Sequence, residues 1–121
     1  MDGINIQIDY FAPAEFVKCT PSCLKSDMDP QFMKRLNRAR RYAGVPFVLN
    51  SAYRNVEYEK NKGRTGNSMH TKGRAVDIRC VDSVSRHQIV QALLAVGFHG
   101  IGIGNTFIHV DDRENKLIWL Y

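Results

Sequence analysis

One long stretch of the chain carries apolar residues at the spacing of an amphipathic helix. It follows Asp29-Pro30, and its apolar positions are Phe32, Met33, Leu36, Ala39 and Ala43. Asp29 is suited to cap the first turn, and Pro30 suits the first helical position. Gly44 is suited to end the helix, and Pro46 prevents it from continuing. The pattern therefore predicts a helix from Pro30 to the residue before Gly44.

A second helix is predicted between Ser85 and Gly97. Ser85 and Gln88 have the spacing of a capping box, and the apolar side consists of Ile89, Val90, Leu93, Leu94 and Val96. A short helix is expected over 55–60 and a single helical turn near 14–17.

Five short segments have the apolar runs or period-two alternation of strands. They are 46–51, 74–80, 101–103, 106–111 and 116–120. The polar turn 112–115 predicts that the last two form a hairpin, and residues 4–10 are expected to be extended. Strands outnumber helices and do not alternate with them regularly. The predicted class is therefore α+β, with a mainly antiparallel sheet and two packed helices.

Length and composition indicate one globular domain spanning 1–121. The hydrophobic fraction is 44% and the charged fraction 24%, which is typical of a globular chain and argues against disorder. No apolar run approaches the roughly 18 residues that a membrane span needs. Residues 1–5 lack the basic and apolar blocks of a signal peptide, so we expect synthesis in the cytoplasm.

The net charge of +5 favours anionic partners, although only weakly. A local basic cluster at 34–41 falls on the first predicted helix, where it is more typical of a solvated face than of a nucleic-acid patch. The three cysteines, Cys19, Cys23 and Cys80, are an odd number and are expected to be reduced. Cys80 continues an apolar strand face and is expected in the core, and no His lies near Cys19 and Cys23 to complete a metal site.

Two strands place metal-ligating side chains among apolar neighbours. Asp77 alternates with Val76 and Ile78, and His109 and Asp111 alternate with Ile108 and Val110. A buried carboxylate needs a partner. His70 lies seven residues before Asp77, and a turn containing Gly73 can fold it back. Three N/O ligands and an open position are typical of catalytic zinc, so these residues are candidates for a metal site. The alternative is that Asp77 pairs with a nearby arginine, Arg74 or Arg79.

Three blocks of sequence resemble those of the zinc D-alanyl-D-alanine carboxypeptidase family, which includes wall-trimming peptidases and phage endolysins. The first is Ser68-x-His70-x-x-Gly73-x-Ala75-x-Asp77. The second, Ser51-Ala52-Tyr53-Arg54, is similar to the family's Ser-Gly-Tyr-Arg block, and the third is Phe107-Ile108-His109-Val110-Asp111. The resemblance runs from about residue 29 to 119. The first block is also similar to the zinc site of the hedgehog signalling domain, which shares the fold.

The resemblance implies a role for each matching residue. His70, Asp77 and His109 match the zinc ligands, and Arg54 matches the arginine that binds the substrate carbonyl and the developing oxyanion. Ser68 matches a residue beside the substrate. In relatives the segment corresponding to 1–28 often lines the substrate groove. Core packing is expected for Tyr53 and Trp119, and the alternative is that these aromatic residues wall the cleft.

The general base is where the sequence departs from the family. Many relatives carry a carboxylate three residues before the last ligand, and here that position is Thr106. Asp111 then has two open roles: general base, or a partner that orients His109.

The function that the resemblance implies is zinc-dependent hydrolysis of peptide bonds in bacterial wall peptides. The expected partner is a peptidoglycan stem peptide, with no nucleic acid and no membrane span, and the chain is expected to be a monomer acting on the cell wall. D-Ala-D-Ala carboxypeptidase and endopeptidase activities both fit, as do bacterial and phage origins. The alternative is a non-catalytic, hedgehog-like zinc-containing binding module.

Overall fold

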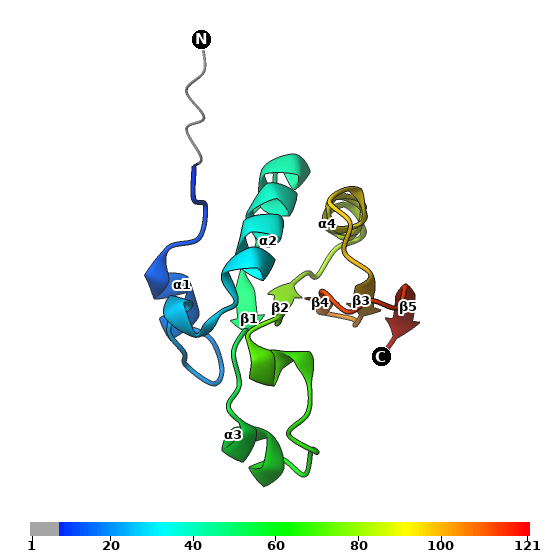
Figure 1. The fold of residues 1–121 in the computed structure, drawn as a ribbon. Helices are drawn as coiled ribbons and strands as arrows, with labels where there is room; N and C mark the ends of the chain where they lie inside the picture. The colour runs from blue at the N-terminus through cyan, green and yellow to red at the C-terminus, as the bar shows by residue number, and fades with distance from the viewer. Residues whose placement is uncertain (1–7) are drawn as a thin grey trace.

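The computed structural model describes residues 8–121 and contains four α-helices, two short 3-10 helices and five strands in this range (Figure 1). The helical elements are α1 (Pro13–Val17), η1 (Lys25–Asp27), α2 (Pro30–Ala43), α3 (Val56–Asn61), η2 (Met69–Lys72) and α4 (Ser83–Ala95). The strands are β1 (Leu49–Ser51), β2 (Ala75–Arg79), β3 (Gly100–Ile103), β4 (Phe107–Asp111) and β5 (Leu117–Leu120). The α+β class is confirmed.

The five strands form one sheet in the order β1-β2-β4-β3-β5. All neighbours are antiparallel except β3 and β5, which are parallel. The predicted hairpin between the last two strands is therefore wrong. Strand β4 already has β2 on one edge and β3 on the other, so β5 cannot pair with it and pairs instead with the outer edge of β3.

The two long helices cover one face of the sheet. In Figure 1, α2 and α4 lie side by side on the same side of the strands, whereas α3 lies away from them. Five sheet residues of this face are fully buried: Val76, Ile78, Ile101, Ile108 and Val110. They pack with apolar residues of both helices in one core. The helices therefore leave the opposite face of the sheet free for polar side chains.

The ends of α2 are those the sequence predicts. Asp29 Oδ1 accepts a hydrogen bond from the Phe32 amide at 2.9 Å, and Gly44 adopts the left-handed conformation with φ of 67°. The start predicted for α4 is wrong, because the helix begins at Ser83 and Asp82 Oδ1 accepts from the Ser85 amide at 2.8 Å. Asp82 is an equally good cap that comes earlier in the chain, so its use adds the residues before Ser85 to the helix.

Much of the N-terminal segment is packed into the core rather than forming a loop over it. Phe11, Phe16, Cys19 and Cys23 are buried in the same cluster as the sheet residues. Most of the segment 4–10 lies outside the described residues, and 8–10 form no strand. All three cysteines are buried and free, and burial raises the pKa of Cys19 to about 12. That the segment 1–28 lines a cleft stays a prediction, as does the single domain.

None of the helices within residues 8–121 combines the length and the apolar character needed to cross a membrane.

Two left-handed glycines differ in the space around them, which predicts different costs of substitution. At Gly73, with φ of 68°, an added Cβ would lie 2.5 Å from the Asp27 carbonyl oxygen, whereas at Gly44 it would meet nothing within 4 Å. Both alanine variants have the left-handed penalty of about 1–2 kcal/mol. We expect Gly73→Ala to lose about 1–3 kcal/mol more of the free energy of unfolding, measured by urea denaturation. Equal losses in the two variants would contradict this packing.

Candidate functional site

The sheet register lines up one row of residues across all five strands. Asp77 on β2 is directly opposite His109 on β4, and it also pairs with Ser51 on β1. On the other side of His109, the row continues through Gly102 on β3 to Trp119 on β5. Directly paired residues project from the same face of a sheet. The row therefore places the carboxylate, the imidazole and the indole together on the face opposite the two long helices.

His70 reaches this face from the short helix η2. Gly73 ends η2 in the left-handed conformation, and the chain then reverses into β2. The backbone of His70 is held by the Arg54 amide, which donates to its carbonyl at 3.2 Å. The side chain is only 2% exposed. The turn thus folds His70 back beside Asp77, as the sequence predicts.

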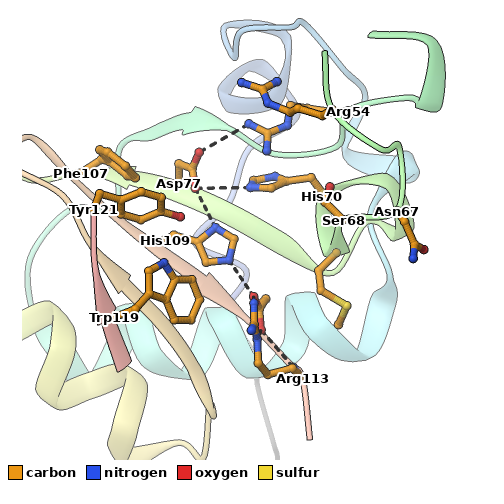
Figure 2. Close-up of a pocket in the computed structure, with 13 residues that line it drawn as sticks. Arg54, Asn67, Ser68, His70, Asp77, Phe107, His109, Arg113, Trp119 and Tyr121 are labelled. Carbon is orange, nitrogen blue, oxygen red and sulfur yellow. Dashed lines mark hydrogen bonds and ion pairs between the residues drawn. The ribbon is translucent and has the colours of Figure 1, made fainter. Parts of the chain in front are cut away.

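The two predicted histidine ligands both approach the third, Asp77 (Figure 2). Asp77 Oδ1 lies 3.0 Å from His109 Nδ1 and 3.4 Å from His70 Nε2. One ligand atom from each residue lies within 4.8 Å of the others. Burial alone would raise the pKa of Asp77, but the adjacent His109 and His70 side chains outweigh it and hold that pKa far below its usual value. The carboxylate is therefore charged and available to a cation.

The hydrogen bonds of the two histidines fit a metal site. His70 Nδ1 donates to the Ala52 carbonyl oxygen at 2.7 Å, so in the neutral ring the lone pair is on Nε2, which is buried and without a hydrogen bond. His109 Nε2 contacts Asp111 Oδ2 at 2.7 Å, so Nδ1 is the nitrogen that faces Asp77. Metal-binding histidines ordinarily have their outer nitrogen tied in this way. Two imidazoles and one carboxylate are a donor set that suits zinc with an open position.

Asp111 has no unused hydrogen-bonding capacity. It is 0% exposed, and its oxygens accept four hydrogen bonds: one from His109 Nε2 and three from the amide, Nε and Nη2 of Arg113, at distances from 2.7 to 3.1 Å. A carboxylate has about four lone-pair positions. Although burial raises the pKa of Asp111, the bonds from Arg113 and His109 lower it well below its usual value. Of its two open roles, this geometry favours the orientation of His109.

Two glycines on β3 leave space for side chains of the neighbouring strands to lie close to its backbone. A Cβ at Gly100 would lie 2.0 Å from Asp111 Oδ1, and a Cβ at Gly102 would lie 2.7 Å from the Trp119 ring. The indole thereby comes within 5.4 Å of the His109 ring, measured between centroids.

Arg54 and Ser68 lie at the rim of the same site. Arg54 Nη1 is 3.7 Å from Asp77 Oδ2 and 3.3 Å from Ser51 Oγ. The Ser68 hydroxyl donates to Glu59 Oε1 at 3.1 Å. Neither Arg74 nor Arg79 takes the pairing with Asp77 that the alternative interpretation expects. Arg74 pairs instead with Asp112 at 2.8 Å, and Arg79 is exposed.

All six predicted site residues line one cavity of about 490 Å³. Residues that sequence reasoning missed complete its lining: Arg64, Asn67, Met69, Phe107, Arg113, Trp119 and Tyr121. The core position expected for Trp119 is wrong, because its ring forms a wall of the cavity together with Phe107 and Tyr121 (Figure 2). The period-two spacing of Trp119 and Tyr121 on the last strand indicates that they share a face, but not which strand lies beside them.

A sequence model of the peptidase M15 family matches residues 9–111. This range is most of the chain, so the chain belongs to that family, whose members are related to the zinc D-Ala-D-Ala carboxypeptidases. The matched range contains all six predicted site residues but ends before Arg113 and β5. No curated protein sequence shows a significant match to the chain.

An orienting role for Asp111 would have a measurable consequence in the variant Asp111→Asn. This variant removes the charge that holds the His109 ring, so zinc affinity should fall about ten- to a hundredfold in a chelator competition assay. Asp112→Asn is the matched control, because Asp112 pairs with Arg74 and does not line the cavity. If Asp111 were instead the general base, zinc affinity would be unchanged and hydrolysis would slow about a hundred- to ten-thousandfold.

Proposed function

We propose that this protein is a zinc-dependent peptidase that hydrolyses peptide bonds in the stem peptides of bacterial peptidoglycan, as a D-Ala-D-Ala carboxypeptidase or a related, endolysin-like endopeptidase. The observation that carries the proposal is the convergence of His70, Asp77 and His109 in an open cavity, with the outer nitrogen of each imidazole already bonded. Membership of the M15 family supports both the metal and the reaction class. The protein would act on the cell wall as a monomer, without nucleic acid.

His70, Asp77 and His109 would hold the zinc ion. When bound, zinc supplies Lewis acidity, which activates a water molecule and polarises the amide carbonyl of the substrate. The protein's own part is to present two neutral imidazoles and one charged carboxylate. Asp111 contributes by fixing the His109 tautomer that leaves Nδ1 free.

Arg54 would bind the substrate carbonyl and stabilise the developing oxyanion. Its side chain is only 15% exposed, and its Nη1 points toward the triad, beside Asp77 (Figure 2). A guanidinium fixed in this way requires little reorganisation when negative charge develops on the substrate. Ser68, on the same rim, would hydrogen-bond to the peptide backbone.

The lining of the cavity suits a peptide that carries carboxylates. Three arginines contribute to it, Arg54, Arg64 and Arg113, each of which also contacts a carboxylate of the protein, and the Arg113 guanidinium lies 4.5 Å from the centre of the Trp119 ring. The aromatic wall can pack against the aliphatic parts of alanyl residues. Stem peptides combine such small side chains with free carboxylates.

A hedgehog-like binding module is the second candidate, and one observation favours it. Within the described chain the cavity is lined by two carboxylates, Asp77 and Asp111. The first belongs to the ligand set, and the second has its lone pairs engaged. Since Thr106 stands where many relatives carry a carboxylate, such a module would bind zinc and peptide without hydrolysis.

Digestion of purified wall peptides separates these two functions. We expect zinc-loaded protein to release fragments whose masses identify the bond, and we expect His70→Ala to release none because the metal is lost. His87→Ala is the control, since His87 is exposed on α4. Zinc measured by elemental analysis should be one equivalent per chain in wild type and in the control. A zinc-loaded wild type that leaves every wall peptide intact would support the binding module instead.

Arg54→Ala tests the role of the guanidinium apart from the metal. We expect the variant to retain zinc and to lose about a hundred- to thousandfold in kcat, the range found for loss of an oxyanion donor. Arg54→Lys should recover only part of this, because an ammonium lacks the fork of two donors. Arg38→Ala on the exposed side of α2 is the charge-matched control. Unchanged turnover in Arg54→Ala would remove this residue from the mechanism.

A further inference from the structure

The short helix α3 buries an acidic residue. Glu59 is 0% exposed and is the one buried residue of the segment Val56–Asn61. An isolated carboxylate in such a place would be strongly destabilising, so its partners must compensate. Asn55 caps the helix by accepting from the Tyr58 amide, and Glu57 on the same helix is exposed. Burial of Glu59 is therefore a specific feature of this position rather than of the whole helix.

The partners of Glu59 include two residues of the candidate active site. Its Oε1 forms an ion pair with Arg54, 3.3 Å from Nε but without the geometry of a hydrogen bond, and accepts from the Ser68 hydroxyl at 3.1 Å. Its Oε2 accepts from Arg64 Nη1 at 2.7 Å, and the Arg64 amide donates to the Glu59 carbonyl at 2.9 Å. One oxygen thus contacts both rim residues, and the other is fixed by a half-exposed arginine.

Without Glu59, the nearest carboxylate for Arg54 would be Asp77. Arg54 Nη1 already lies 3.7 Å from Asp77 Oδ2, which is longer than a good hydrogen bond. Arg54 Nε contacts Glu59 on the side of the guanidinium away from Asp77, and this contact limits the approach of Arg54 to Asp77. Although burial raises the pKa of Glu59, the bond from Arg64 and the charge of Arg54 lower it below its usual value, so the carboxylate is charged.

We propose that Glu59 is a positioning residue, which holds Arg54 and Ser68 in the geometry needed to bind the peptide substrate. The proposal rests on the peptidase function for its kinetic consequence, but not for the contact itself. Arg64 completes the network by holding the outer oxygen of Glu59. Residues that fix a substrate-binding group strongly affect rate, since a displacement of about 1 Å can cost about a hundredfold.

The first measurement is independent of activity. In ¹⁵N NMR spectra of the full chain, the Arg54 Nε–Hε signal should be shifted by the nearby Glu59 charge and protected from exchange, because this group is buried, although it makes no hydrogen bond. Glu59→Gln should move the signal and speed its exchange, whereas Glu57→Gln should leave it unchanged. If Glu59→Gln does not fold, Glu59→Asp, which shortens the side chain and keeps its charge, should move the same signal. An Arg54 signal unaltered in the folded variant would overturn the proposal.

The second measurement is a double-mutant cycle on wall-peptide hydrolysis with zinc-saturated enzyme. Glu59→Gln should lower kcat/KM about ten- to a hundredfold in wild type and should have a clearly smaller effect in the Arg54→Ala background, because only its action through Ser68 remains there. The same loss in both backgrounds would show a merely structural role and overturn the proposal. A wild type that hydrolyses no wall peptide refutes the peptidase function, while the NMR comparison still decides whether Glu59 holds Arg54.

Discussion

The direct pairing of Asp77 with His109 across β2 and β4 is the constraint on which the rest of the site depends. Residues alternate between the two faces of a sheet, so a slip of one position would bury both polar groups against α2 and α4. Val76 and Ile78, fully buried beside Asp77, prevent that slip because they would have to face the cavity. The register that stabilises the core thus also aligns the ligands, and loss of core packing on β2 would disorder the site.

Strand β3 contributes to the site because two of its residues are glycines, which leave space for neighbouring side chains. Gly100 leaves room for the paired Asp111 and Arg113, and Gly102 leaves room for the Trp119 ring. A strand with side chains at these positions would separate β4 from the aromatic wall of β5. Glycine weakens a strand, so its presence at these two sites is consistent with a requirement for close approach.

Period-two alternation and one glycine turn were enough to predict that His70, Asp77 and His109 share a face, because those signals are local. The pairing of β5 was not predictable from the polar turn 112–115, since it depends on which strand edge remains free. Trp119 was misplaced for a related reason: its wall position requires knowing that β5 lies next to β3. Glu59 gave no signal, because a Glu in a short charged helix is ordinarily solvated and its three partners come from other segments.

The acidic groups of this region differ in whether an arginine pairs closely with them. Asp111 is neutralised by Arg113 through three hydrogen bonds, and Glu59 is held between two arginines. Asp77 has only a distant arginine contact of 3.7 Å, and its near neighbours are the two imidazoles. Because imidazoles are uncharged when they bind a metal, Asp77 is the carboxylate whose charge is left for an added cation. The arrangement therefore concentrates uncompensated negative charge at the one point where three ligand atoms meet.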